Sequence, residues 1–389
     1  MTQQQIIALD KEYIANTYSR FPVALASGKG SIVTDFDGRE YIDLGSGIAV
    51  NAFGHCDSEW QNAVTRQMGT LCHCSNLYTS LPQTKLAEQL CSRTGMKKVF
   101  FSNSGAEANE CAIKTARKYA HHNRSASCSN IITLTGSFHG RTVTTLAATG
   151  QDLFHTDFQP FTEGFVYTAP NDTGAMLSLV KKHTTAAVLI ELIQGEGGVN
   201  VLDEGFVTQT AMACAENDVL LIIDEVQTGN GRTGTLYLYE QYGITPDIVT
   251  TAKGLGGGLP IGATLMGEKC QSTLGAGKHG STFGGNPLCC AGALSVLSRI
   301  DCDLLEGVKE REALVRSTLE GADGIEYITG KGLLLGVKTV KKASEVIARC
   351  LEDGVLVLSA KDKVRLLPAF NIPIQLLKKG LETIKKAAV

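Results

Sequence analysis

The sequence lacks three features that would place it in a specialised class: an excess of one charge, a long apolar run and a signal peptide. The net charge of −3 over 389 residues includes no block of like charge, which argues against nucleic acid or an anionic membrane as a partner. The apolar run that starts at Ala186 is interrupted by Glu191, well short of a membrane span. Residues 1–9 lack a basic start, so no signal peptide is predicted. We expect a cytoplasmic protein without nucleic-acid or membrane partners.

The cysteine pattern is typical of neither a disulfide framework nor a zinc site. The twelve cysteines are scattered over a long chain, and we expect them to be reduced and mostly packed as small apolar residues. Cys72-His73-Cys74 is the one metal-like cluster, but its spacing is too tight for a zinc knuckle and no second pair follows. The sequence therefore predicts no metal site.

Alternating strand and helix patterns between residues 98 and 266 predict an α/β fold with a mostly parallel, doubly wound sheet. The pattern beyond Asn286, which precedes Pro287 as a helix cap would, is typical of a smaller α+β domain. Asp37-Gly38 is a favoured pair for a type I′ hairpin turn. The predicted domains are an N-terminal segment that joins the small domain (1–55), a large domain (56–285), and a long connecting helix with the small C-terminal domain (286–389).

Two of the predicted strands end in residues that could hold a cofactor. The apolar strand 219–223 ends at Asp224, and the strand 247–252 ends at Lys253. Ligands bind at the carboxyl ends of the strands in a parallel α/β sheet. A lysine there could bind the aldehyde of a pyridine-ring cofactor, and the aspartate could keep the ring nitrogen protonated. A buried ion pair, or two solvated charges, would give the same pattern, so other motifs must decide.

Two further segments fit such a site. The strand 98–101 runs into Ser104-Gly105-Ala106-Glu107, which has capping-box spacing at a helix start, where free N–H groups could bind a phosphate. An ordinary capped helix explains this segment equally well. In a later loop, Phe138 could stack on a ring and Arg141 could bind a carboxylate through two parallel hydrogen bonds. The alternative is a surface loop with one core phenylalanine.

The segment 229–234 fits G-x-G-x-x-G, the pattern of a dinucleotide site and hence of a nicotinamide-dependent oxidoreductase. Its context is poor, because residues 224–228 separate it from the preceding strand and no helix pattern follows. We interpret the match as accidental.

Six motifs together resemble the class III pyridoxal-phosphate (PLP) aminotransferases, in the order and at the spacing of that family. They are the segments 103–110, 137–142, 193–198, 223–229, 252–254 and 281–287. The resemblance covers nearly the whole chain and implies the PLP-dependent transferase fold of type I. Within the class, residues 47–55 and 75–78 are similar to those of acetylornithine aminotransferases.

The resemblance implies roles for the cofactor-binding residues. Lys253 would bind the cofactor covalently and move the proton during catalysis, and Asp224 would pair with the pyridinium nitrogen. Gln227 would bond the phenolic oxygen of the ring. Phe138 would stack on one ring face, with Val226 behind the other.

The phosphate of PLP would lie against Ser104, Gly105 and Ala106, helped by the partner subunit's Thr282. This contact implies a homodimer.

The resemblance also implies how two substrates are bound. Arg141 would bind a substrate carboxylate. Arg365 would receive the α-carboxylate of glutamate, and Glu196 would mask that arginine while the other substrate is bound. Ile48 stands where ornithine δ-aminotransferases carry a tyrosine, which favours a substrate with an acylated α-amino group, and Ser281 is a further substrate-binding residue.

The implied reaction is a ping-pong transamination of N-acetylornithine with 2-oxoglutarate. It yields N-acetylglutamate 5-semialdehyde and glutamate, a step of arginine biosynthesis. The alternatives within the family are ω-aminotransferases acting on succinylornithine, succinyl-diaminopimelate, ornithine or 4-aminobutyrate. A nicotinamide-dependent oxidoreductase, or a non-catalytic binding protein with this scaffold, would be a function of another class.

Overall fold

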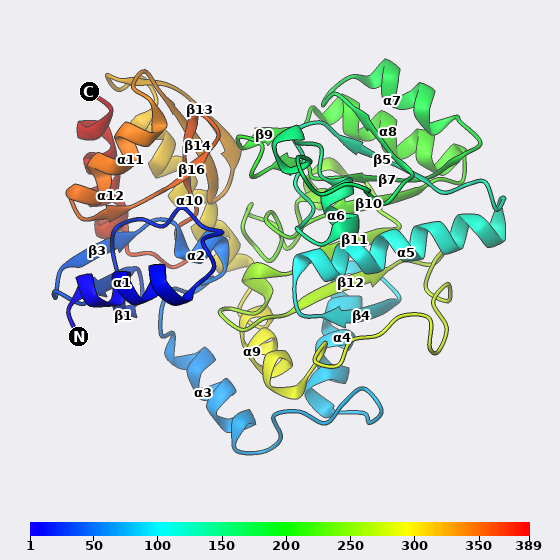
Figure 1. The fold of residues 1–389 in the computed structure, drawn as a ribbon, viewed down its shortest axis with the longest axis horizontal. Helices are drawn as coiled ribbons and strands as arrows, with labels where there is room; N and C mark the ends of the chain where they lie inside the picture. The colour runs from blue at the N-terminus through cyan, green and yellow to red at the C-terminus, as the bar shows by residue number, and fades with distance from the viewer.

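The structure is a computed structural model that describes residues 1–389, and it has two lobes (Figure 1). The larger lobe contains a seven-stranded sheet with the order β4-β12-β11-β10-β7-β5-β6. Its strands are β4 (Lys98–Ser102), β5 (Asn130–Leu134), β6 (Phe165–Thr168), β7 (Thr185–Ile190), β10 (Leu220–Asp224), β11 (Ile248–Thr251) and β12 (Gly262–Met266). Only β12 runs antiparallel to its neighbours. The predicted mostly parallel α/β sheet is therefore confirmed.

Both faces of this sheet are buried, which explains why its strands read as continuous apolar runs. Leu221 and Ile223 of β10 belong to the larger core, and most of the helical residues of this core come from the helices named next. These helices are α4 (Leu81–Thr94), α7 (Thr173–Val180), α8 (Glu204–Glu216) and α9 (Pro287–Leu297). Leu220 and Ile222 point the other way and pack with α5 (Gly105–Asn123). Each such side chain contributes roughly 2 kcal/mol by leaving water, so β10 is held firmly between the two layers.

The smaller lobe has its own core and an antiparallel sheet of order β13-β14-β17-β16. The strands are β13 (Ile325–Lys331), β14 (Leu334–Thr339), β16 (Leu358–Ala360) and β17 (Lys363–Leu366). Three helices accompany this sheet: α10 (Cys302–Leu319), α11 (Ala343–Glu352) and α12 (Ile374–Ala388). One face of α12 supplies the buried residues Leu377, Leu381 and Ile384, at the spacing of an amphipathic helix.

A second small sheet, of order β1-β2-β3-β15, joins the two ends of the chain. Its strands are β1 (Leu25–Lys29), β2 (Ile32–Asp35), β3 (Glu40–Asp43) and β15 (Val355–Leu356). The β2–β3 hairpin forms as predicted, but its turn is not of type I′. Gly38 has a φ of +84° and its N–H donates to the carbonyl of Asp35, whereas Asp37 does not have a positive φ. Only one left-handed residue is therefore needed, as in a type I turn followed by a glycine.

The predicted long connecting helix is two helices. The Asn286 side chain accepts a hydrogen bond from the N–H of Cys289 at 2.9 Å, so the cap of α9 is as predicted. However, α9 ends at Leu297, and Asp301 caps α10 by accepting from the N–H of Leu304.

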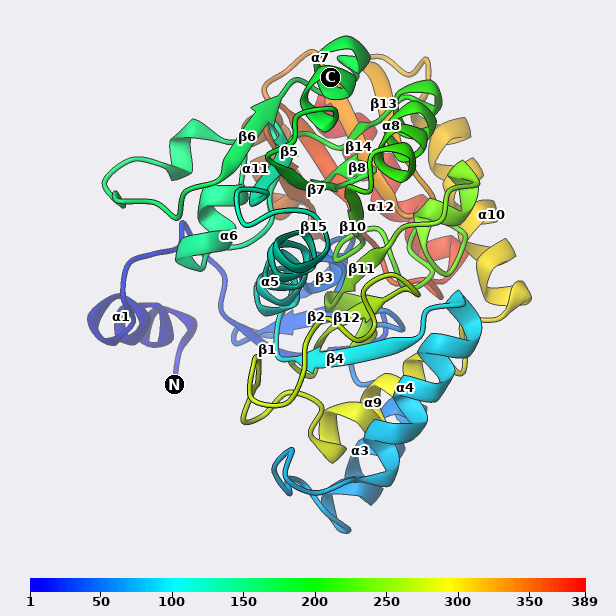
Figure 2. The ribbon, with the colours of Figure 1, turned by 90° about the vertical axis from the view of Figure 1, so that its right-hand side faces the viewer.

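The remaining elements are short or lie at the surface. They are α1 (Gln3–Tyr13), α2 (Ser46–Ala49), α3 (Ser58–Met68), α6 (Val143–Ala148), β8 (Ile193–Gln194), β9 (Asn200–Val201), η1 (Asp152–Phe154), η2 (Leu238–Tyr242) and η3 (Lys253–Leu255). Helix α1 buries none of its residues and projects from the rest of the molecule (Figure 2), and the Gln3 side chain at its start donates to Asp37 in the β2–β3 turn at 3.1 Å.

Candidate active site

A cavity of about 470 Å³ lies at the carboxyl ends of β10 and β11, where the sequence predicts a ligand. Eight of the predicted site residues line it: Ser104, Gly105, Ala106, Phe138, Arg141, Asp224, Val226 and Lys253. They come from the ends of β10 and β11, the start of α5, and the loop between β5 and α6. The fold thus brings together side chains that are far apart in the sequence.

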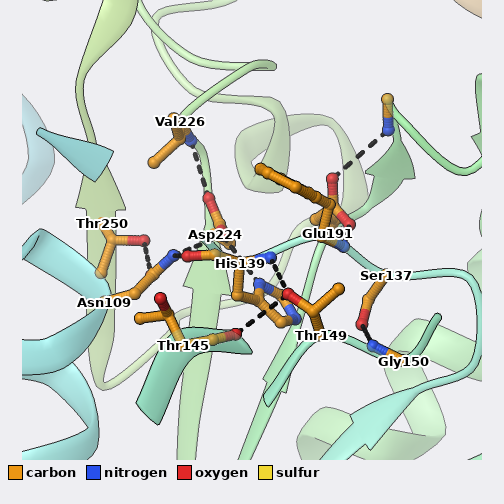
Figure 3. A network of polar contacts seen from close by, with 12 residues as sticks. Asn109, Ser137, His139, Thr145, Thr149, Gly150, Glu191, Asp224, Val226 and Thr250 are labelled. Carbon is orange, nitrogen blue, oxygen red and sulfur yellow. Dashed lines mark hydrogen bonds and ion pairs between the residues drawn. The ribbon is translucent and has the colours of Figure 1, made fainter. Parts of the chain in front are cut away.

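Asp224 is the centre of a buried polar network (Figure 3). Its Oδ2 accepts hydrogen bonds from Asn109 Nδ2 and lies 2.8 Å from His139 Nδ1, while its Oδ1 accepts from the N–H of Val226 at 3.0 Å. The side chain of Asn109 is held in turn by the hydroxyl of Thr250, which donates to Asn109 Oδ1 at 2.7 Å. Because a carboxylate has about four acceptor positions, Oδ1 retains one that can face the cavity.

Lys253 follows β11 and lines the cavity beside Asp224. Its φ of +45° lies in the left-handed region, which non-glycine residues rarely adopt. Burial lowers the pKa of its amine; Glu196 opposes this shift and Arg365 adds to it. A lowered pKa increases the fraction of uncharged amine, which is the nucleophilic form.

The start of α5 forms one wall of the cavity. The Ser104 hydroxyl accepts from the N–H of Glu107 at 3.2 Å, and the Glu107 carboxylate accepts from the N–H of Asn103 at 2.6 Å. The first N–H groups of a helix have no partner within it, so those of Gly105 and Ala106 are available to an anion. A Cβ on Gly105 would lie 2.7 Å from Val226 Cγ1, so only glycine lets these two walls approach so closely.

Phe138 and Arg141 lie on the loop that precedes α6. The Arg141 guanidinium is 5.6 Å from the ring centre of Phe138 and 4.3 Å from that of Phe154. Arg141 is otherwise exposed, so its guanidinium is positioned by aromatic rings and remains open to a carboxylate.

A second charged group lies next to the cavity, between the lobes. Arg365 NH1 donates to Glu196 Oε1 at 2.6 Å and to Gln227 Oε1 at 3.0 Å. Arg365 is 3% exposed, and its Nε has no partner. The Arg365 guanidinium lowers the pKa of the Glu196 carboxyl against the opposing effect of burial. The predicted pair of Arg365 with Glu196 is therefore formed in this structure.

Besides Gln227, Glu196 and Arg365, which lie next to the cavity, three further predicted residues lie outside the lining of the cavity in their own chain. Ile48 lines a separate apolar pocket with residues of the small lobe. Ser281 accepts a hydrogen bond from Asn103 Nδ2 at 3.2 Å. Thr282 is exposed.

The segment 229–234 does not form a dinucleotide site. It lies in turns between β10 and η2, and Arg232 at its centre is buried. The Arg232 guanidinium donates to the carbonyls of Leu333 and Pro368 and lies 4.5 Å from the ring centre of Phe370. The segment therefore connects the two lobes.

No group of three or more His, Cys, Asp or Glu side chains is placed to hold a metal ion, and all twelve cysteines are free. The helices include none with the length and apolarity that a membrane span requires.

Comparison with known protein families identifies this arrangement. The family described as "Aminotransferase class-III" matches residues 13–388. The chain belongs to the class III aminotransferases.

Relatives of this aminotransferase are similar over nearly their whole length. The chain is 47% identical over 386 residues to the acetylornithine aminotransferase of Haemophilus ducreyi, covering 99% of this chain and 98% of that protein. It is 41% identical over 374 residues to the acetylornithine aminotransferase of Methanocaldococcus jannaschii, covering 95% and 94%.

Two solved structures show the same fold. The ornithine aminotransferase of Toxoplasma gondii superposes with a TM-score of 0.95 at 32% identity, covering 100% of this chain and 95% of that one. The N-acetylornithine aminotransferase of Stenotrophomonas maltophilia superposes with a TM-score of 0.84 at 36% identity and covers 98% of both chains.

Three buried polar residues of this aminotransferase site are not predicted from the sequence: Asn109, His139 and Glu191. Asn109 and His139 hold Asp224, as described above. The Glu191 carboxylate accepts from the N–H of Phe138 at 2.9 Å and from that of Gly195 at 3.3 Å. Burial raises the pKa of Glu191 well above its ordinary value, and Asp224 raises it further. Only their positions in the sequence could have indicated them. Asn109 and His139 lie inside the motifs 103–110 and 137–142, and Glu191 directly follows the apolar run 186–190.

Proposed function

We propose that the chain transfers the δ-amino group of N-acetylornithine to 2-oxoglutarate with PLP as cofactor. The products are N-acetylglutamate 5-semialdehyde and glutamate, as in arginine biosynthesis. The observation that carries this proposal is the meeting of Lys253, Asp224 and an anion-binding helix start in one cavity, beside an arginine masked by Glu196. Similarity to curated acetylornithine aminotransferases over nearly the full chain supports the choice of substrate.

The residues around the cavity fit PLP. The open acceptor position of Asp224 suits a protonated ring nitrogen, and the free N–H groups of Gly105 and Ala106 suit a phosphate. The ring of Phe138 offers a flat apolar face, and Lys253 supplies an amine. When bound, PLP acts as an electron sink for the pair of electrons that remains when a proton leaves the substrate carbon.

Lys253 would hold the cofactor covalently and then move a proton. Its lowered pKa increases the fraction of the amine that is uncharged at a given pH. In the proposed reaction the free Lys253 Nζ removes the proton from the amine-bearing carbon of the substrate and returns it on the product side. A general base must lie within hydrogen-bond reach of the proton that it takes, and Lys253 projects from the cavity wall.

Asp224 would keep the ring nitrogen protonated because it is held as a buried carboxylate. Asn109, His139 and the N–H of Val226 all direct hydrogen bonds at it, so both of its oxygens are fixed in position. The Asp224 carboxylate is therefore held in one orientation, and its Oδ1 keeps one acceptor position open toward the cavity.

The two arginines would distinguish the two substrates. N-acetylornithine carries one carboxylate, which Arg141 would bind while Glu196 neutralises Arg365. 2-Oxoglutarate carries two, and its second carboxylate would displace Glu196 from Arg365. Bidentate binding of a carboxylate by arginine would give each complex its orientation.

Transamination of free ornithine is the second candidate. It is favoured by the high TM-score to the Toxoplasma gondii structure, which is named as an ornithine aminotransferase. Ile48, where a tyrosine would stand in ornithine δ-aminotransferases, supports the acylated substrate.

We further propose that the chain acts as a homodimer in which the partner subunit's Thr282 reaches the phosphate. Four large apolar side chains are more than half exposed near this loop: Leu77, Tyr78, Leu81 and Phe283. They lie on two segments that contact each other, because the Asn76 side chain donates to the carbonyls of Ser281 and Gly284. An apolar surface of this kind is typical of a protein–protein interface.

Spectroscopy and a substrate panel test the proposed function. The purified protein loaded with PLP should absorb visible light, lose that absorbance on addition of N-acetylornithine, and regain it with 2-oxoglutarate. Lys253→Ala should show no turnover, and borohydride should fix the cofactor to the wild type but not to this variant. Faster turnover of free ornithine than of N-acetylornithine would favour the second candidate, and a protein that never binds PLP would refute both.

A further inference from the structure

The loop that carries Glu196 is docked into the sheet of the small lobe. It comprises residues 195–200, from the end of β8 to the first residue of β9, and β9 lies beside β13 (Figure 1). Directly before β9, Val199 is fully buried and has a φ of +54°, an unusual conformation for a β-branched residue. Such a conformation persists only where surrounding contacts hold it.

Two glycines of the small lobe make room for Val199. A Cβ added to Gly336 of β14 would lie 2.9 Å from Val199 Cβ, and one added to Gly330 of β13 would lie 3.0 Å from Val199 Cγ1. The valine therefore fills a recess in this sheet, and the loop is attached to the lobe that carries Arg365.

A polar contact holds the same loop from β17. Lys363 Nζ donates to Asn200 Oδ1 at 3.3 Å and to the Thr329 hydroxyl at 3.1 Å. The side chain of Asn200 also donates to the carbonyl of Gly197 at 2.9 Å, which ties the contact to the residue next to Glu196. Through Asn200 and Gly197, Lys363 is thereby linked to Glu196, the residue that pairs with Arg365.

Lys363 is an unusual residue at this place. It is 4% exposed, although lysine is almost never fully buried unless it is paired with an opposite charge. Its two hydrogen-bond partners are neutral, and its Nζ lies 5.4 Å from the ring centre of Tyr327. Burial lowers the pKa of its amine, and Asp362 opposes this shift. Lys363 and Arg365 are two residues apart on one strand, so their side chains point to the same face.

We propose that Lys363 is a positioning residue that, through Asn200, holds the loop 195–200 against β17 and so sets how firmly Glu196 masks Arg365. The contact determines the balance between substrates with one carboxylate and substrates with two. This inference rests on the proposed function of Arg365 and Glu196. A firm mask favours N-acetylornithine, because Arg365 then offers no competing site for its carboxylate. A loose mask favours a dicarboxylate, because less energy is needed to displace Glu196.

The test measures the two classes of ligand separately in the PLP-loaded protein. Asn200→Ala removes the contact without changing the charge. We expect glutarate, a five-carbon dicarboxylate, to bind about three- to tenfold more tightly by isothermal titration calorimetry, the size of effect of one or two lost hydrogen bonds. The KM for N-acetylornithine should rise by a similar factor, with a smaller change in kcat. A merely structural lesion would weaken both ligands together.

Lys363→Met should act in the same direction when it is compared with Lys338→Met. Lys338 is the register partner of Lys363 on β14, and its amine pairs with Asp362 rather than with the loop. This control removes the same charge from the same region. Glu196→Gln should give a larger shift of the same sign.

The outcomes separate this proposal from the proposed function. A wild type that binds glutarate but does not turn over N-acetylornithine refutes the proposed substrate, and the glutarate affinities of the variants still test the contact. Glutarate affinity of Asn200→Ala within twofold of wild type, or weaker than wild type, overturns the role of Lys363. Absence of any glutarate binding to the wild type overturns both.

Discussion

At the scale of single residues, the site depends on a carboxylate that is buried yet well supplied with hydrogen-bond donors. Asp224 is 4% exposed, and a charge at such depth is stable only if it is paired or hydrogen-bonded. Asn109 and His139 supply two of its donors from positions 115 and 85 residues away. The ends of β10 and β11 allow Asp224 and Lys253 to be predicted, because a charged residue stops each apolar run. The supporting residues could not be predicted, because only the fold brings them to Asp224.

Asp224→Asn should retain the fold and the ability to bind PLP but lose most of its activity. The amide is neutral, so it cannot keep the ring nitrogen protonated, and its NH2 group would face the donors of Asn109 or His139. Removing one group that stabilises charge in the transition state lowers kcat by about 100- to 1,000-fold. Steady-state kinetics and the absorbance of bound PLP measure the two effects. Asp203→Asn, at an exposed position, is the matched control, and a kcat within tenfold of wild type would argue against the role of Asp224.

At the scale of elements, the end of β10 places two neighbouring carboxylates in opposite surroundings. Asp224 faces the cavity, whereas the next residue, Glu225, is completely buried. The Glu225 carboxyl accepts hydrogen bonds from the Thr228 hydroxyl and from the N–H of Tyr239. These bonds lower its pKa, but burial outweighs them and raises the pKa from 4.5 to about 7. The alternation of a strand thus directs one carboxylate to the site and the other into the core.

Glu225→Gln should make the protein more stable than wild type at high pH and similar at low pH. Between pH 4.5 and about 7, the folded wild type holds a proton on Glu225 that the unfolded chain has lost. The free energy of unfolding therefore falls as the pH rises through this window, by at most about 3 kcal/mol. Glutamine stays neutral, so the difference in Tm should grow by a few degrees between about pH 5 and about pH 8. The exposed Glu216→Gln should show no such trend, and a Tm difference that is independent of pH would contradict the raised pKa.

The elements also show which parts of a fold depend on local sequence. The buried strands, the cap at Asn286 and the helix that starts after Ser104 are predicted from runs and spacings within about ten residues. The turn at Asp37-Gly38 is predicted in place but not in type, because the dipeptide is compatible with more than one turn geometry. The docking of Val199 between β13 and β14 depends on glycines more than 130 residues away along the chain, so no local pattern indicates it.

At the scale of the whole molecule, the two lobes meet at contacts that also serve the site. Arg365 reaches from β17 to Glu196, and Arg232 reaches from the large lobe to the carbonyls of Leu333 and Pro368. The family and the mostly parallel sheet are confirmed, whereas the domain boundaries and the roles of the site residues stay predictions. Because Arg365 and Arg232 each bind across the boundary between the lobes, we expect a shift of one lobe relative to the other to alter the pair of Arg365 with Glu196.

The proposed dimer should depend on the exposed apolar group near Thr282. Leu77 is 86% exposed within the apolar group that also includes Tyr78, Leu81 and Phe283. In a two-fold symmetric dimer each copy would bury the same surface, so Leu77→Asp would introduce two charges into one apolar interface. We expect the wild type to sediment as a dimer and this variant as a monomer.

The change in assembly should also change the cofactor affinity, and this links the surface to the site. Without the partner subunit's Thr282 the phosphate loses one donor, so the monomeric variant should release PLP during gel filtration while the wild type retains it. Val340→Asp is the control, because Val340 is an exposed apolar residue too (71%) but lies on the small lobe, far along the chain from this apolar group. Sedimentation velocity and the PLP content of each fraction measure the two effects. A Leu77→Asp variant that remains a dimer would place the interface elsewhere, and a monomer that retains PLP fully would show that each cavity binds its phosphate alone.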